Sequence, residues 1–117
     1  MTATSDSGTV RRGTVRKFGR PLAAGVTLDD LVLPRAQKEQ MPFVLNTAQV
    51  EVGARLPLHS HSEREIWVIT NGSGTLHRDA EAFDVCPGDV VLFQPGVEHE
   101  LVNTCAEPIR LVSVYWS

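Results

Sequence analysis

Short apolar runs recur along the chain from residue 41 onward, and polar or glycine-containing turns separate them. The runs are rich in Val, Ile, Leu, Phe, Thr and Trp, which strands favour. The turns include Asn71-Gly72, Pro87-Gly88 and Pro95-Gly96, whose residues favour tight reversals. We expect strands at residues 41–52, 65–70, 75–78, 82–85, 89–93, 98–103 and 108–116. Strands this short at such regular spacing predict an all-β fold, either an antiparallel sandwich or a small barrel.

The first forty residues follow a different pattern. Residues 26–40 are the one stretch where we expect helix, and Pro34 would keep any helix there short. Residues 1–20 contain five Lys or Arg residues against one Asp and few large apolar side chains. This segment is either a solvated tail or an edge strand that pairs with a sheet. We therefore divide the chain into a basic N-terminal segment, residues 1–20, and a barrel domain, residues 21–117.

Composition limits the class of protein. A chain of 117 residues has room for one domain with its own core. A net charge of -3 and a pI of about 5.7 give no reason to expect nucleic acid as a partner. No apolar run is long enough to span a membrane, and the N-terminus lacks the apolar core of a secretory signal, so we expect a cytoplasmic protein. In that compartment Cys86 and Cys105 should be reduced thiols.

Four residues have the types and spacing of metal ligands. His59, His61 and Glu65 fall within seven positions, and His99 follows in a later segment. Side chains two apart on a strand point to the same face, so His59 and His61 could reach one point if both lie on one strand. Imidazole and carboxylate ligands together suit Fe, Mn, Ni, Zn, Co or Cu.

The same residues stand in a recognisable glycine frame. Gly53, His59, His61, Glu65 and Gly72 resemble the first motif of the cupin superfamily in every spacing. The segment 88–103, which contains His99, is similar to the second motif. It departs from that motif where Gln94 stands in place of the usual proline two positions before Gly96. The two motifs and their flanking strands resemble a small single-domain cupin over most of the chain after residue 40.

The resemblance implies a jelly-roll β-barrel, also called a double-stranded β-helix, that holds one divalent transition metal. The implied ligands are His59, His61, Glu65 and His99. It also implies a metal-dependent enzyme acting on a small oxygen-rich organic substrate, as a dioxygenase or as a redox-neutral isomerase, lyase or cyclase. We lean slightly toward the dioxygenase. The alternative is a non-catalytic cupin that binds a small molecule or a metal.

No motif assigns catalytic residues beyond the ligands. Strand alternation places Trp67 and Ile69 on the same face as Glu65, and Leu101 on the same face as His99. The candidates for the pocket wall are Trp67, Ile69, His77, Glu98 and Leu101. Arg55 and Arg64 flank the ligand segment and are either solvated or available to an anionic substrate. A barrel this small has strand edges that a second copy could pair with, so we also expect a homodimer, with residues 1–20 and 41–52 as the contact.

Overall fold

The computed structural model describes residues 16–32 and 42–117, and these contain ten strands and no helix. The strands are β1 Arg16–Ala23, β2 Val26–Val32, β3 Val44–Val50, β4 Arg55–His59, β5 Arg64–Asn71, β6 Gly74–Arg78, β7 Glu81–Val85, β8 Val90–Phe93, β9 His99–Val102 and β10 Ile109–Trp116. The described residues therefore include no helix that is long and apolar enough to cross a membrane.

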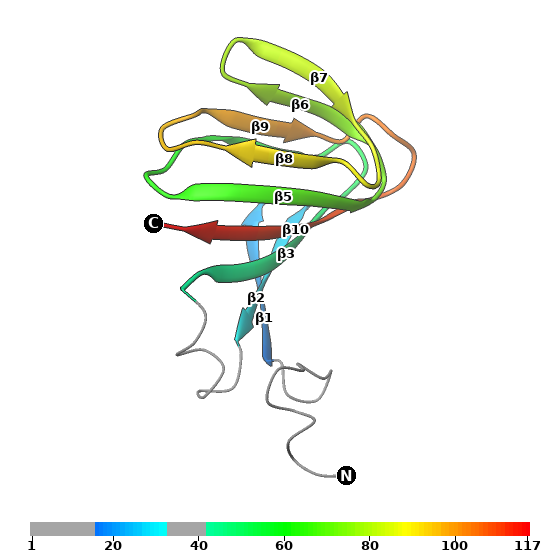
Figure 1. The fold of residues 1–117 in the computed structure, drawn as a ribbon. Helices are drawn as coiled ribbons and strands as arrows, with labels where there is room; N and C mark the ends of the chain where they lie inside the picture. The colour runs from blue at the N-terminus through cyan, green and yellow to red at the C-terminus, as the bar shows by residue number, and fades with distance from the viewer. Residues whose placement is uncertain (1–15, 33–41) are drawn as a thin grey trace.

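The strands form two antiparallel sheets that enclose the core. The six-stranded sheet has the order β1-β2-β3-β10-β5-β8, and the four-stranded sheet has the order β4-β9-β6-β7. Figure 1 shows β8, β5, β10 and β3 following one another down the near side, with β6 and β7 at the top and the β1–β2 hairpin below. This arrangement is a jelly roll, and it confirms the predicted all-β fold.

Alternation along the central strands decides which side chains enter the core. On β5, Glu65, Trp67 and Ile69 are buried while the residues between them are partly exposed. On β10, Ile109, Leu111 and Ser113 are buried in the same way. The core between the sheets contains Val26, Ala48, Val50, Leu56, Trp67, Ile69, Leu76, Val85, Val91, Phe93, Leu101, Ile109 and Leu111. A polar or charged residue at an inward position, such as Glu65, therefore needs a partner inside the barrel.

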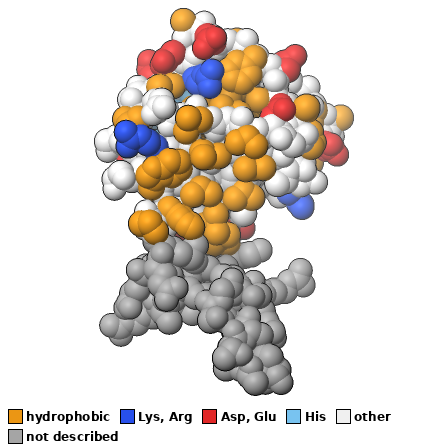
Figure 2. All heavy atoms as spheres, in the orientation of Figure 1, with side chains coloured by type: hydrophobic (Ala, Val, Ile, Leu, Met, Phe, Trp, Pro, Cys, Tyr) orange, Lys and Arg blue, Asp and Glu red, His pale blue; other side chains and the backbone are white. Residues whose placement is uncertain are grey.

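The outer face of the six-stranded sheet is apolar as well. One row of paired residues across it is Leu45, Val114, Ile66 and Leu92, and the next is Thr47, Val112, Val68 and Val90. Figure 2 shows hydrophobic side chains gathered over this side of the molecule. Val90 is 65% exposed, and Leu92 is 44% exposed.

The predicted strands from residue 41 onward are confirmed, with ends that differ by a few residues. The helix expected within residues 26–40 is wrong for residues 26–32, which form β2, and residues 33–41 lie outside the described part. β2 pairs with β1 on one side and with β3 on the other. Asp29 and Asp30 have low strand propensity, so local sequence did not predict β2. Backbone pairing with β1 and β3 stabilises it.

The predicted N-terminal segment is described only from Arg16. From there the backbone forms β1, which lies at an edge of the six-stranded sheet and crosses the predicted boundary between residues 20 and 21. β3 is paired on both sides, so its backbone is not a free edge for a second copy. The homodimer stays a prediction. Cys86 and Cys105 are both free thiols.

Candidate metal centre

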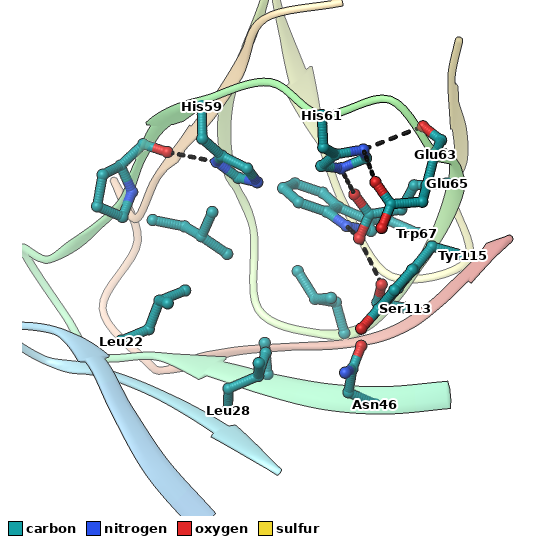
Figure 3. A pocket seen from close by; sticks show the side chains of 14 residues that line it. Leu22, Leu28, Asn46, His59, His61, Glu63, Glu65, Trp67, Ser113 and Tyr115 are labelled. Carbon is teal, nitrogen blue, oxygen red and sulfur yellow. Dashed lines mark hydrogen bonds and ion pairs between the residues drawn. The ribbon is translucent and has the colours of Figure 1, made fainter. Parts of the chain in front are cut away.

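His59, His61, Glu65 and His99 come together at one end of the barrel. One potential ligand atom from each lies within 4.8 Å of those of the other three, so the cluster could hold a metal ion. His59 ends β4 and is paired with His99 at the start of β9, while Glu65 lies near the start of β5. Figure 3 shows His59, His61 and Glu65 around a common space.

The condition that both residues lie on one strand is not met for His59 and His61. β4 ends at His59, and His61 lies in the loop that leads to β5. The amide of Gly96 donates a hydrogen bond of 2.9 Å to the carbonyl oxygen of His61 and holds this loop against the β8–β9 turn. The register of β4 also shifts between Leu56 and His59. The two imidazoles therefore meet through a loop held by another turn, rather than through simple strand alternation.

Backbone carbonyl groups fix the tautomer of all three imidazoles. The Nδ1 atom of His59 lies 2.7 Å from the oxygen of Pro57, and that of His61 lies 3.0 Å from the oxygen of Glu63. The Nδ1 atom of His99 lies 2.9 Å from the oxygen of Val97. Because a carbonyl oxygen can only accept, each Nδ1 carries the proton and donates it. Each Nε2 is left to face the cluster, as in histidines that bind metals through that nitrogen.

His99 is the most enclosed member of the cluster. Its side chain is fully buried, and its ring stacks on Phe93 with centroids 4.0 Å apart. Its Nε2 is a buried atom without a hydrogen-bond partner, 3.5 Å from Oε1 of Glu65. A buried polar atom left without a partner costs about 1–3 kcal/mol. A metal ion bound by Nε2 would remove that cost.

Glu65 is held in place through its other oxygen. Its Oε2 accepts hydrogen bonds from the indole Nε1 of Trp67, at 2.8 Å, and from the hydroxyl of Ser113. Its Oε1 lies 2.8 Å from Nε2 of His61. One carboxylate oxygen is therefore anchored, and the other is presented to the imidazoles.

The electrostatics keep these groups in the forms that bind metals. Burial raises the pKa of Glu65, but His99, Ser113, Trp67 and His61 interact with the carboxylate and together lower the pKa to about 2. Burial lowers the pKa of His59, although the Pro57 carbonyl opposes the shift. At neutral pH Glu65 is therefore ionised, and His59 is held toward its neutral form, with a free lone pair.

The four donor atoms fit a divalent transition metal. Lone pairs on imidazole nitrogens and a carboxylate oxygen repel one another at these separations unless a positive charge lies among them. A proton on one imidazole relieves the repulsion between that nitrogen and one neighbouring atom. A metal cation among the four donor atoms attracts all of their lone pairs. Three nitrogen ligands and one oxygen ligand suit ions of the iron-to-zinc series.

A cavity of about 390 Å³ opens beside the cluster. His59, His61 and Glu65 line it, together with Trp67 from the set of predicted pocket residues. The other candidates lie outside this lining. Ile69 and Leu101 are in the core. His77 lies on β6, and Glu98 is exposed next to β9, where its amide donates to Asp79.

The structure adds polar cavity residues that the sequence did not single out, namely Asn46, Glu63, Ser113 and Tyr115. A signal was available for one of them. Ser113 interrupts the apolar alternation of β10 at an inward position, where a polar side chain needs a partner. That partner is Glu65.

The hydroxyl of Ser113 should matter for metal binding although it is not a ligand. In Ser113→Ala, Oε2 of Glu65 loses one of two donors, and we expect metal affinity to fall about tenfold, as is usual when a residue that orients a ligand is removed. Isothermal titration with zinc measures this effect. Ser62→Ala is the matched control, because within the described part of the chain that hydroxyl bonds Glu63 and not a ligand residue. Equal affinities in the two variants would contradict the positioning role.

The sequence profile of the cupin domain family matches residues 46–115, and the chain therefore belongs to the cupin family. An uncharacterized protein of Methanocaldococcus jannaschii is 33% identical over 69 residues, which are 58% of this chain and 55% of that protein. The chain thus matches little more than half the length of this curated relative.

Two solved structures are similar over nearly the whole chain. A cupin 2 conserved barrel domain protein from Salinispora arenicola has a TM-score of 0.72 and 27% identity, with 93% of this chain and 86% of that chain covered. A predicted oxalate decarboxylase from Thermotoga maritima has a TM-score of 0.73 and 20% identity, with 92% and 97% covered. At that identity the second likeness concerns the fold alone.

Proposed function

We propose that this cupin is a divalent-metal-dependent enzyme that acts on a small, oxygen-rich organic molecule. The observation that carries the proposal is that three of the four cluster residues line a cavity of about 390 Å³, a size suited to a small ligand. A purely structural metal site would be closed off from such a space. The alternative is a cupin that binds a small molecule at this site without turning it over.

The residues around the cluster define what the protein itself contributes. When bound, a divalent ion supplies Lewis-acid polarisation of a substrate oxygen or, if it is redox-active, one-electron chemistry. The three backbone carbonyls hold the imidazoles in one orientation, and Ser113 and Trp67 hold Glu65. The aliphatic side chains of the cavity exclude water from the substrate, which strengthens electrostatic interactions there. The ligand positions are therefore organised before a substrate arrives.

The proposed enzyme is either a dioxygenase or a redox-neutral isomerase, lyase or cyclase. Both classes use such a metal site, so the experiment has to distinguish them. Protein purified without added metal is analysed for bound metals, and O₂ uptake and product formation are followed with a panel of enols, β-diketones and catechols. Iron together with substrate-dependent O₂ uptake would support the dioxygenase, toward which we lean. Zinc, nickel or manganese with product but without O₂ uptake would support an isomerase, lyase or cyclase.

Two further outcomes count against the proposal. Tight binding of a panel compound to metal-loaded protein, with no product, would favour the non-catalytic alternative. Protein that neither retains metal nor binds added zinc, iron, nickel or manganese would contradict the metal site itself.

A further inference from the structure

The cavity beside the cluster has an apolar wall. Leu22 and Leu28 come from the β1–β2 hairpin, Ala48 from β3, Leu56 from β4 and Leu111 from β10. In Figure 3 Leu22 and Leu28 face His59 and His61 across the cavity. A ligand whose oxygens reach the cluster therefore has hydrocarbon side chains beside the rest of its body. Burying apolar ligand surface there is favourable.

The described lining offers no positive charge to this part of a ligand. Its charged residues are Glu63 and Glu65, and none of its described members is Lys or Arg. The two arginines that flank the ligand segment, Arg55 and Arg64, lie outside the lining and are exposed. Arg55 is 3.4 Å from Glu100. Among the described lining residues, a carboxylate on the distal end of a ligand would therefore meet two acidic side chains and no Lys or Arg, and burying it there is costly.

The cavity is also lined by a buried, uncharged amide, that of Asn46. Asn46 is 2% exposed, and its Nδ2 donates to Oδ1 of Asp30 at 3.0 Å. Because Nδ2 is the donor in this bond, the amide is oriented with Nδ2 toward Asp30. The amide still has its Oδ1 acceptor and the second N–H of Nδ2 for other partners. Such a neutral group can pair with a ligand hydroxyl, but it supplies no positive charge to balance a carboxylate.

We infer that the substrate is a molecule with chelating oxygens at one end and an uncharged alkyl or aryl body at the other. The inference rests on the proposed function, since it assumes that the oxygens bind at the metal. It excludes small di- and tricarboxylates, whose second charge would lie against the leucines. The inference also implies that the β1–β2 hairpin contributes to substrate selection, because Leu22 and Leu28 form part of the cavity wall.

Matched catechols test this inference on zinc-loaded protein. The probes are 4-methylcatechol and 3,4-dihydroxybenzoate, which present the same oxygen pair and differ in the charge of the distal group. We expect isothermal titration to show the methyl compound bound at least about tenfold more tightly, since a buried unpaired charge costs more than 1.4 kcal/mol. Equal or tighter binding of the carboxylate, or no binding of the methyl compound, would overturn the inference.

A charge introduced into the wall supplies a second test. Leu28→Lys places an ammonium group in the lining. It should shift the ratio of affinities for 4-methylcatechol and 3,4-dihydroxybenzoate by about tenfold or more in favour of the carboxylate. Leu58→Lys is the control, because Leu58 is 56% exposed on β4 and outside the lining, and it should leave the preference unchanged. The same preference in both variants would overturn the inference. Zinc content is measured in every sample, so a failed metal site is distinguished from zinc-loaded protein that shows no preference.

Discussion

A protein carrying His61→Ala should be purified with little metal and should bind added zinc or iron at least about 100-fold more weakly than the natural chain. Removing a residue that only orients a ligand commonly costs 10–100-fold, and the loss of a ligand should cost more. The side chain of His61 is 26% exposed, so its truncation leaves no sealed void in the core. The fold should therefore survive, and the measured loss should report the site.

His77→Ala is the matched control for this variant. His77 is a partly exposed histidine on β6 that belongs neither to the cluster nor to the cavity lining. Metal analysis and titration should give the natural affinity for it, and circular dichroism should show the same strand content in all three proteins. A His61→Ala protein with unchanged metal content would show that the ligands are misassigned.

Most strands after residue 41 and the ligand types could be predicted because both depend on local sequence. β5 and β10 have the alternation and β-branched residues that a half-buried strand requires, and the structure buries Glu65, Trp67 and Ile69 together as that alternation predicts. The glycine frame also has a structural reason. Gly72 has φ near +72°, and a Cβ there would lie 2.5 Å from the carbonyl oxygen of Pro108. Only glycine fits that turn without strain.

The cavity wall could not be predicted because distant segments build it. Leu22 and Leu28 line it only because β2 pairs with β3 and carries β1 to the edge of the sheet. Asp29 and Asp30 concealed that strand from a propensity argument. Ile69 and Leu101 share a strand face with ligands, yet they point into the core, because alternation gives the face of a sheet but not the depth along the barrel.

His61 shows the same limit within the ligand set. Its spacing from His59 was sufficient to mark it as a ligand, while its position depends on a loop that the amide of Gly96 holds. Residue identity and spacing thus indicated the chemistry of the site. The closure of the two sheets determines its geometry and selects the side chains that face a substrate.

Metal binding should also stabilise the fold by a large amount. The four donors come from β4, the following loop, β5 and β9, so an ion bound by all of them joins segments that separate on unfolding. A ligand present at 1,000 times its dissociation constant, and bound only by the folded chain, adds about 4 kcal/mol. For a domain of this size that should raise Tm by more than about 10 °C. Differential scanning calorimetry of chelator-treated protein, with and without added zinc, measures the shift.

His61→Ala serves as the control in the same experiment. Its Tm should change little on addition of zinc, because one of the ligands that join β4 to β5 is missing. In the natural chain the buried Nε2 of His99 has no hydrogen-bond partner, and a bound ion would give it a bonding partner. This gain is a structural reason to expect stabilisation by zinc. If zinc raised Tm equally in the two proteins, the stabilising ion would be bound elsewhere. If zinc raised the Tm of neither protein, the cluster would not be a metal site under these conditions. The unpaired Nε2 of His99 would then destabilise the fold with no bound ion to offset it.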